Sequence, residues 1–536
     1  MAAWLAPLAL LLVAGSLLAP FNHDEDQYYG AALAFLDGTP YRDFLYLQTP
    51  LTLWPGAALL ALMPGHGLFA LRIATALMGL ALLWIVARTA EDLAQAYRAG
   101  APAHLPPALA ALLTVAGSYS FLFAATVYRN DMLPALLFAG ACALAALRLP
   151  AADPARRRGT LAAIGLLLGL AASAKINYAL LPAAPALWLL TRREEPLSRR
   201  FGALAFLGAG FAAGLAPTLL YLARAPEAFG WSVVHFGAHA PLDWYETIGE
   251  GHRLTPGGRA LDSLVILAQG PALIAIGLVA RARFFGARAD AGKNDAATQA
   301  RDDLLDLLLL VALIAAAVPN PAWRQYFLVP LPPLALRLPG ALAALGATGR
   351  PRAVALGLLV LGSTVGLISW GVPLAQTAEA PERSILMHYR EAHWLRETFA
   401  RHHLQGEVAT LSPHLVVDSG ARLDPRFASG VFVYRWDRAE ERATILRLNG
   451  LTADTAPAQL ALRPPAAIVT GYEGRGGSSF GVDLDAPLRR FAERNRYLRL
   501  HSPIGPVILY IRPHGRTADR QNRAQYPARP SPAPAF

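Results

Sequence analysis

Apolar runs near twenty residues in length recur along the first 375 positions of the chain. A helix of about 20 apolar residues crosses roughly 30 Å of hydrocarbon, so we expect these runs to be membrane-spanning helices. They lie at 2–20, 68–88, 105–124, 132–148, 160–175, 178–191, 202–223, 263–280, 303–318, 326–345 and 353–375. The pattern predicts a polytopic α-helical membrane protein with about eleven spans.

A further apolar run at positions 50–67, PLTLWPGAALLALMPGHG, is short and is broken by proline and glycine. Irregular backbone at membrane depth is tolerated only where protein or water satisfies it. We therefore expect a re-entrant or interfacial helix here. A full crossing would reverse the side of the membrane assigned to every later loop.

The pattern changes from Gln376 onward, where amphipathic helical stretches alternate with short strand-like runs. REAHWLRETFARHH and APLRRFAERNRY have helical periodicity, whereas GEVATLSP, PAAIVTGY and GPVILYIRP are typical of strands. This alternation predicts an α/β domain at 377–513, after a transmembrane domain at 1–375. The Pro- and Arg-rich segment 514–536 has no periodicity and is expected to be a disordered tail.

Composition and charge support a membrane location and indicate the orientation. The chain is 54% hydrophobic and 16% charged, against about a quarter charged in soluble proteins. The net charge of +11 comes with basic residues clustered in alternate loops, as in the cytoplasmic loops of membrane proteins, so we expect no nucleic acid partner. These cations are Arg98, Arg156, Arg157, Arg158, Arg192, Arg193, Arg199, Arg200, Arg281, Arg283, Arg288, Lys293, Arg350 and Arg352.

This bias places the N-terminus in the cytoplasm, and it places the loop after the first span and the α/β domain outside. The Ala-, Arg- and Pro-rich composition favours a bacterial chain, hence a multi-pass protein of the inner membrane with its C-terminal domain periplasmic or extracellular. Each outward loop carries a compact polar cluster: HDEDQYY, YRND, SAKINY, HFGAHAPLDWYE and PNPAWRQY. Polar groups at membrane boundaries are costly and are usually functional, so we expect the site on the outer face.

The first cluster holds three consecutive carboxylates, Asp24, Glu25 and Asp26. A solvated acidic loop is the simplest interpretation. A carboxylate beside the membrane can also act as a general base toward a hydroxyl or bind a divalent cation through oxygen.

The later clusters add charges that have structural interpretations of their own. Asp131 can begin a helix, Lys175 can be a snorkelling lysine, and Arg324 can belong to an aromatic belt. Together the clusters place two acidic sites and at least two cations on one side of the membrane. That arrangement suits a lipid-linked anionic donor, whose phosphate the cations bind while a carboxylate activates the nucleophile.

Two other motifs receive no assignment. His235, His239 and Asp243 have a spacing of four that suits a metal site on a helix, but we expect Pro241 to interrupt the helix, and no zincin glutamate accompanies them. GYEGRGGSSFG at 471–481 lacks the Lys-Ser/Thr of a P-loop and is expected to be a mobile loop.

Taken in order, these motifs resemble the GT-C glycosyltransferase superfamily, in particular the branch of protein O-mannosyltransferases and lipid A aminoarabinose transferases. Members of this branch begin with one span and an external loop bearing an Asp-Glu pair and an aromatic residue. DEDQY supplies these as Asp24, Glu25 and Tyr28, and GTPYRDF continues like the bacterial members.

The later motifs of the branch also have matches in this chain. Asp131 matches an acid at the start of the fourth span, and Lys175 matches a lysine that ends a span. RQYFLVPLPP supplies Arg324 and Tyr326. The resemblance covers residues 1–375, which we expect to form a GT-C-like catalytic domain, and the α/β end is similar to the external domains of some relatives.

The resemblance implies an inverting hexosyl- or pentosyltransferase that moves a sugar from a polyprenyl-phosphate donor to a lipid, glycan or protein acceptor on the outer face. Asp24 would be the general base or orient the acceptor hydroxyl, with Glu25 supporting it or joining Asp131 in positioning the sugar or a metal. Which of Asp24, Glu25 and Asp26 is the base stays open. The donor phosphate would be held by Lys175, Arg324, Arg129 and Tyr326. A divalent cation such as Mg²⁺ or Mn²⁺ is compatible with this chemistry and is not required by it.

Two other functions compete with this interpretation. In a transporter or flippase the same charges would line a substrate path; in a receptor or scaffold the external domain would be the active part. The charges gather at one membrane boundary, and the chain shows no inverted repeat, which favours the transferase.

Overall fold

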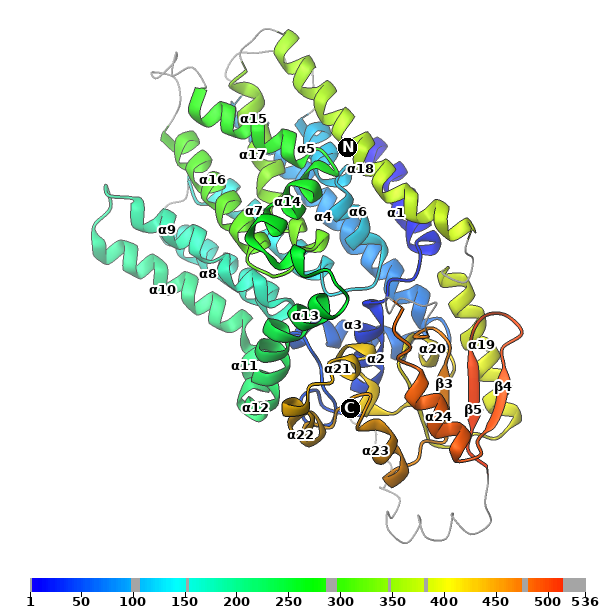
Figure 1. Cartoon of the computed structure of the whole chain (residues 1–536). Coiled ribbons are helices and arrows are strands. Elements are labelled where there is room, and N and C mark those ends of the chain that lie inside the picture. Colours follow the sequence, from blue (N-terminus) through cyan, green and yellow to red (C-terminus); the bar gives the residue numbers. More distant parts are fainter. Residues whose placement is uncertain are drawn as a thin grey trace.

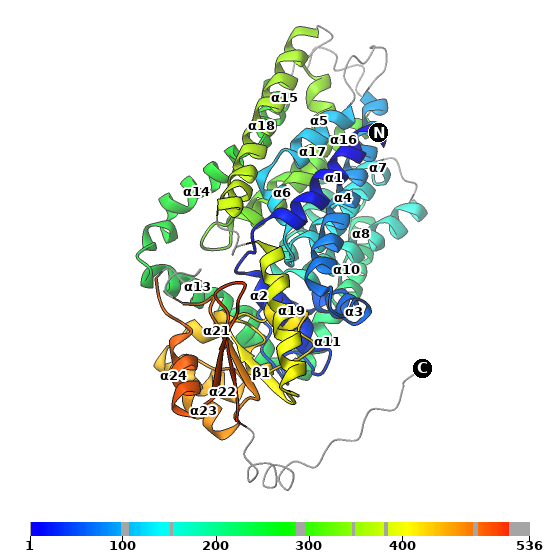
Figure 2. The same cartoon turned by 90° about the vertical axis from the view of Figure 1, so that its right-hand side faces the viewer.

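The computed structural model describes residues 2–97, 107–150, 154–285, 296–345, 349–379, 384–474 and 481–513. Outside these residues lie the expected tail at 514–536, most of the glycine-rich motif at 471–481, and three of the loop cations, Arg98, Arg288 and Lys293. Figures 1 and 2 show a bundle of helices with an α/β region at one end, and helices α2 and α13 at the junction between them.

Each predicted span coincides with a helix or with two consecutive helices (Figure 1). The helices of the bundle are α1 (Ala2–Leu18), α4 (Gly67–Tyr97), α5 (Pro107–Ala116), α6 (Tyr119–Thr126), α7 (Met132–Arg148), α8 (Pro154–Ala174), α9 (Ala183–Thr191), α10 (Leu197–Gly214), α11 (Ala216–Arg224), α14 (Pro256–Ala268), α15 (Ala272–Phe285), α16 (Ala296–Ala317), α17 (Leu331–Ala343) and α18 (Gly349–Glu379). Shorter helical segments connect them: α2 (Glu25–Phe35), η1 (Pro50–Thr52), α3 (Leu53–Leu62), η2 (Ile176–Leu180), α12 (Pro226–Phe229), the π-helical turn η3 (Gly230–His235), α13 (Phe236–Thr247), η4 (Gly251–Leu254) and η6 (Arg324–Leu328).

Three helical segments of the described chain are long and apolar enough to cross a membrane: Gly67–Gln95, Arg324–Ala343 and Arg350–Thr377. Three pairs of helices meet the same criterion if each pair is taken as one bent span, with bends of 69° for α5–α6, 57° for α10–α11 and 93° for α14–α15. Length and composition therefore give three to six spans, and the expected count of about eleven stays a prediction. The interrupted run at 50–67 forms the short helices η1 and α3, as a re-entrant or interfacial segment requires.

Glycine and proline mark the places where the paired helices break. Gly117 separates α5 from α6, and Gly270 and Pro271 separate α14 from α15. A proline ring lacks the N–H of a helical hydrogen bond and clashes with the preceding turn. The two breaks contact each other, because the amide of Tyr119 donates to the carbonyl of Gln269 at 3.0 Å.

The α/β region contains a five-stranded sheet in the order β2-β1-β3-β5-β4. The strands β2, β1 and β3 are parallel, whereas β5 is antiparallel to both β3 and β4. The strands are β1 (Glu407–Thr410), β2 (Arg422–Leu423), β3 (Ala467–Thr470), β4 (Leu498–His501) and β5 (Ile508–Ile511). The helices of this region are α19 (Ile385–Arg401), α20 (His414–Val417), η8 (Pro425–Phe427), α21 (Val431–Arg435), α22 (Ala439–Arg447), α23 (Ala456–Leu462) and α24 (Ala486–Arg494).

Alternate residues of the strands pack against helices on opposite faces of the sheet. Leu395 of α19 shares a buried cluster with Val469 of β3, whereas Leu488 of α24 shares one with the neighbouring Ile468. Successive side chains of a strand point to opposite faces, so both faces of the sheet are covered at β3, whose four residues are all buried. The two helices and three strands expected from the sequence are all present here, and the domain boundary at 377–513 stays a prediction.

Candidate functional site

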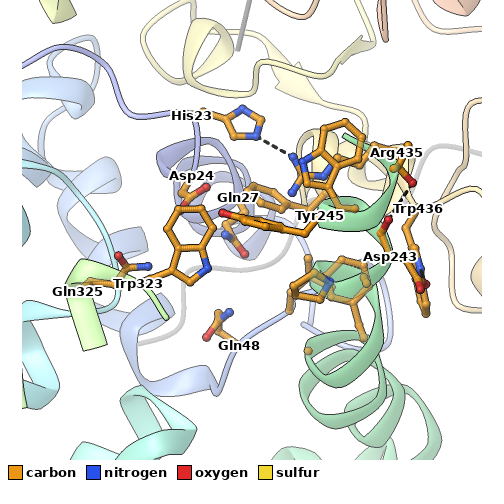
Figure 3. A pocket seen from close by; sticks show the side chains of 18 of the residues that line it. His23, Asp24, Gln27, Gln48, Asp243, Tyr245, Trp323, Gln325, Arg435 and Trp436 are labelled. Atoms are coloured by element: carbon orange, nitrogen blue, oxygen red, sulfur yellow. Dashed lines mark hydrogen bonds between the residues drawn. The ribbon is translucent and has the colours of Figure 1, made fainter. Parts of the chain in front are cut away.

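A cavity of about 500 Å³ lies where the bundle meets the α/β region (Figure 3). All five polar clusters of the predicted outward loops contribute to its lining or to the charges directly behind it. Residues of the segment 432–438 of the α/β region also line the cavity. The volume is within the range of about 300–1,000 Å³ that small-molecule sites occupy.

An alternating row of charges forms one side of this cavity. Asp24 precedes α2 and is ion-paired with Arg129, which is also ion-paired with Asp131 at 2.9 Å (Arg129 Nε to Asp131 Oδ2). Asp131 is in turn ion-paired with Lys175, which follows α8. The row therefore joins four of the predicted site residues, Asp24, Arg129, Asp131 and Lys175. Of its two carboxylates, Asp24 is the one that lines the cavity.

The local fold explains how these side chains meet. Asp131 immediately precedes α7 and Lys175 immediately follows α8, and these two helices pack against each other. Their adjoining ends therefore bring the two charges together at one level of the bundle. Asp131 is 1% exposed, and a buried carboxylate is retained when it is paired with cations.

Aromatic rings form the other walls of the cavity. Tyr326 lies beneath Lys175, with the ammonium nitrogen 4.9 Å from the ring centroid. Tyr245 and Trp323 meet edge to face with centroids 5.6 Å apart. Amide side chains of Gln27, Gln48 and Gln325 also line the cavity (Figure 3). Aromatic faces and amides beside a charged row form a lining suited to a polar ligand with apolar faces.

The Asp24 carboxyl is held in its ionised form. Burial alone would raise its pKa, but the charge of Arg129, together with the neighbouring His23, more than offsets burial and lowers the pKa below its ordinary value. Asp24 therefore presents a carboxylate to the cavity at neutral pH and accepts hydrogen bonds there.

Glu25 lies outside the cavity, although the sequence placed it beside Asp24 as a partner in the chemistry. Its carboxylate forms a fully buried ion pair with Arg72 of α4, at 2.9 and 2.5 Å. It also accepts hydrogen bonds from the amides of Asn22 and Tyr128. These four donors saturate Glu25, so it fixes the loop and does not face a ligand.

Asp26 points in a third direction, toward the α/β region. Its Oδ1 atom faces Nδ1 of His414 at 2.7 Å and accepts from the His414 amide at 3.1 Å. His414 in turn contacts His388 at 2.7 Å between ring nitrogens. Asp26 is 2% exposed and belongs to this buried chain rather than to the cavity.

Arg324 lies between the cavity-lining residues Trp323 and Gln325 in the sequence, but its own side chain does not line the cavity. Its guanidinium donates to the hydroxyl of Tyr119 and lies over the Phe123 ring, 5.2 Å from the centroid. It lines a smaller cavity of about 130 Å³ between α1, α6 and α18. Arg129 lies over the same Phe123 ring at 5.6 Å, so one ring separates Arg324 from the charge row.

The expectation that Pro241 interrupts its helix was wrong, because α13 runs from Phe236 to Thr247 through this residue. A proline removes one helical hydrogen bond, and Asp243 on the same helix is held by Trp436 at 2.7 Å and by Arg438. His235 is paired with Glu441 at 2.8 Å. Within the described ranges, no three His, Cys, Asp or Glu residues are grouped as a metal site requires.

Sequence reasoning missed the contribution of the α/β region to the cavity. Phe432, Arg435 and Trp436 line it, and all three come from the stretch VFVYRWDR. This cluster of aromatic and basic residues in a predicted outer domain was the available signal. Its spacing matched no motif, and only the docking of α21 brings it to the cavity.

No family model and no curated protein sequence matches this chain. Solved structures with a similar fold include ArnT from Cupriavidus metallidurans bound to undecaprenyl phosphate, with a TM-score of 0.58 and 14% identity over 95% of this chain and 97% of that one. The same protein in its apo state matches with a TM-score of 0.56 and 14% identity, over the same shares of the two chains. ArnT is a lipid A aminoarabinose transferase, the kind of protein that the sequence motifs resemble, and at 14% identity these matches show a similar fold.

A third structure found is that of the Archaeoglobus fulgidus oligosaccharyltransferase, with 14% identity and a TM-score of 0.48. This match covers 94% of the present chain and 72% of the oligosaccharyltransferase chain. At that score the match adds nothing to the fold assignment. The likeness to ArnT extends over nearly the whole chain and thus includes both the bundle and the α/β region.

Proposed function

We propose that this protein is a membrane glycosyltransferase that moves a sugar from a polyprenyl-phosphate donor to a lipid, glycan or protein acceptor. The observation that carries the proposal is the cavity in which the Asp24 carboxylate faces outward from a row containing Arg129 and Lys175. The fold shared with ArnT, which was solved with undecaprenyl phosphate bound, supports a donor of this class. We place the cavity on the extracytoplasmic side of a bacterial inner membrane, as the distribution of basic loops favours.

In the proposed reaction the acceptor hydroxyl donates a hydrogen bond to Asp24. Its oxygen forms a bond to the anomeric carbon, while the bond from that carbon to the phosphate oxygen breaks and its electron pair stays on the phosphate. The hydroxyl proton passes to Asp24, and the polyprenyl phosphate leaves. A single displacement of this kind inverts the anomeric centre.

The lowered pKa of Asp24 indicates whether this residue mainly orients the hydroxyl or mainly removes its proton. A carboxyl with a lowered pKa is a weak base, so its main contribution is to orient the hydroxyl and to accept a proton late in the step. Because phosphate is a good leaving group, the attacking hydroxyl needs little activation by a base. The larger requirement is to stabilise negative charge on the departing phosphate.

Arg129 and Lys175 are the residues we assign to that phosphate, since both line the cavity and both carry positive charge. Arg324 lies behind Phe123 and borders the smaller cavity beside α18, so we assign it to the part of the phosphate or lipid nearest the bilayer. Tyr326 supports Lys175 through its ring. Asp131 positions Arg129 and Lys175 and does not contact the ligand.

A divalent cation fits poorly into this charge row. Asp24 and Asp131 are each already paired with cations of the protein, and Glu25 is saturated by Arg72 and two amides. Mg²⁺ and Mn²⁺ need several free oxygen ligands. The proposed reaction therefore does not depend on a metal ion. A path across the membrane, as in a transporter, is less well supported, since the charged cavity lies at one end of the bundle.

The variant Asp24→Asn tests this function. Membranes containing the protein are supplied with a panel of undecaprenyl-phosphate sugars, and envelope glycolipids and glycoproteins are analysed by mass spectrometry. Removal of the carboxylate is expected to lower transfer by about 100-fold or more, whereas Asp37→Asn, whose exposed carboxylate contacts Arg422, leaves transfer unchanged. Full transfer by Asp24→Asn would remove Asp24 from the mechanism. Lack of transfer by the unmodified protein with every donor would favour a transporter.

A further inference from the structure

The α/β region contributes one cation to the cavity that has no carboxylate partner within the described residues. This is Arg435, the last residue of α21. The other cations that line the cavity, Arg129, Lys175 and Arg438, are each ion-paired. Among these lining cations, Arg435 is therefore the one whose positive charge is most available to an anionic ligand.

Aromatic rings hold the guanidinium of Arg435 by its faces. Its central carbon lies 4.3 Å from the Trp244 ring centroid and 4.7 Å from that of Phe432. A single N–H group, on Nη1, donates to Nε2 of His23 at 3.2 Å (Figure 3). A guanidinium carries five N–H donors, so the contacts within the described residues use only part of its capacity.

This position is costly for a cation. Burial lowers the pKa of Arg435 to about 10, although Asp24 and Glu473 act in the opposite direction. Arg435 is half-buried, and a charge withdrawn from water is normally paired within the protein or by a ligand. Contacts with two rings and one imidazole compensate only in part, since the attraction of a cation to an aromatic ring is weaker than a charge-assisted hydrogen bond to an anion.

We propose that Arg435 binds a phosphate group of a ligand in the cavity, so that the α/β region supplies an anion subsite in addition to Arg129 and Lys175. The planar fork of arginine matches the oxygens of a phosphate, which a point charge does not. Two sources share this chemistry: the phosphate of a polyprenyl-phosphate donor and a phosphate carried by the acceptor. The inference rests on the proposed function for the nature of these two ligands.

A structural role is the competing interpretation. Arg435 stacks on Trp244 of α13, and it could serve only to brace α21 against that helix. A brace predicts a loss of stability on substitution, without any preference for charged over neutral ligands. An anion subsite predicts the reverse, because the guanidinium distinguishes a phosphate from an uncharged analogue of the same shape.

The experiment measures equilibrium binding to the full chain in lipid nanodiscs, by tryptophan fluorescence. The probes are undecaprenyl phosphate and glucose 6-phosphate, whose phosphate is not on the anomeric carbon, each compared with its uncharged counterpart, undecaprenol or glucose. The variants are Arg435→Gln and the conservative Arg435→Lys, and the matched control is Arg442→Gln. Arg442 of α22 is 35% exposed, is ion-paired with Asp437 and Asp454, and does not line the cavity.

Arg435→Gln is expected to weaken the binding of at least one phosphate probe by about tenfold or more, with Arg435→Lys recovering part of the loss and Arg442→Gln showing none. Loss for undecaprenyl phosphate assigns Arg435 to the donor, and loss for glucose 6-phosphate alone assigns it to the acceptor. Unchanged binding of both, or failure of both to bind the unmodified protein, overturns the proposal. If Arg435→Gln does not fold, Arg435→Lys alone decides: binding equal to the unmodified protein for both probes overturns the fork-specific contact.

Because no turnover is required, this result is independent of the transfer assay. Arg435-dependent phosphate binding without any sugar transfer would keep the anion subsite and reject the glycosyltransferase. Transfer without Arg435-dependent binding would do the opposite.

Discussion

At the scale of single residues, the main finding is that three consecutive carboxylates have three different partners. Asp24 pairs with Arg129, Glu25 with Arg72 and Asp26 with His414. Successive residues at the start of a helix point about 100° apart, so one turn distributes its charges among different neighbours. The sequence identified this cluster as the centre of the site. It could not say which carboxylate reaches the ligand, because the partners lie far away in the chain.

The buried pair between Glu25 and Arg72 gives a test at this scale. Glu25→Gln leaves the Arg72 guanidinium buried with 0% exposure and no compensating charge. We expect the free energy of unfolding to fall by about 3–5 kcal/mol, measured by chemical unfolding in detergent. Asp37→Asn, which removes an exposed pair with Arg422, is expected to change it by less than about 1 kcal/mol.

An unfolding free energy that is equal in Glu25→Gln and the unmodified protein would contradict the structural role of Glu25. Loss of sugar transfer in a stably folded Glu25→Gln would instead return this residue to the chemistry.

At the scale of elements, apolar runs predicted helix positions well because an α-helix satisfies its own backbone and needs only a run of suitable length. The breaks within α5–α6 and α14–α15 were not predicted. Each break frees backbone groups, and the contact from Tyr119 to Gln269 satisfies some of them across two segments about 150 residues apart in the chain. The same limit applies to α13, where contacts of Asp243 with the α/β region accompany a helix that continues through Pro241.

The start of α4 shows how one element depends on another. Asp418, which follows α20, accepts hydrogen bonds from the amides of Gly67 and Leu68 at 2.7 and 3.2 Å. These are the first amides of α4, which have no partner within the helix. The α/β region therefore caps a helix of the bundle.

Asp418→Ala is expected to leave both amides buried and to destabilise this junction by about 1–3 kcal/mol. Hydrogen–deuterium exchange followed by mass spectrometry should show faster exchange at 67–70 than in the unmodified protein. Asp424→Ala serves as the comparison, because that carboxylate is paired with Arg426 inside the α/β region. Equal protection of 67–70 in Asp418→Ala and the unmodified protein would exclude the capping role.

At the scale of the whole molecule, the sequence predicted a helical part followed by an α/β part, while the side of the membrane on which the charges lie stays a prediction. It did not predict that the α/β region completes the cavity, because that depends on how two parts dock. Arg435 shows the limit clearly: nothing in its spacing relates it to Asp24, and α21 brings the two into one lining.

The orientation of the molecule is tested by cysteine labelling in a Cys142→Ala background. A cysteine replacing Arg42, an exposed residue in the loop after α2, is expected to react with a membrane-impermeant maleimide added to intact cells or spheroplasts. A cysteine replacing Arg199, exposed at the start of α10, is expected to react only after permeabilisation. Labelling of the second position alone from outside would reverse the topology, and with it the proposed location of the cavity.

The position of Asp26 has a consequence for the order of synthesis. Its partner His414 is 388 residues later in the chain. The ribosome therefore finishes the whole helical bundle before His414 is synthesised. Until then, the loop carrying Asp24 lacks the contact between Asp26 and the α/β region. A chain truncated before His414 would contain the charge row in full but would lack the contact that holds this loop at Asp26, so synthesis through His414 is a condition for assembling the site.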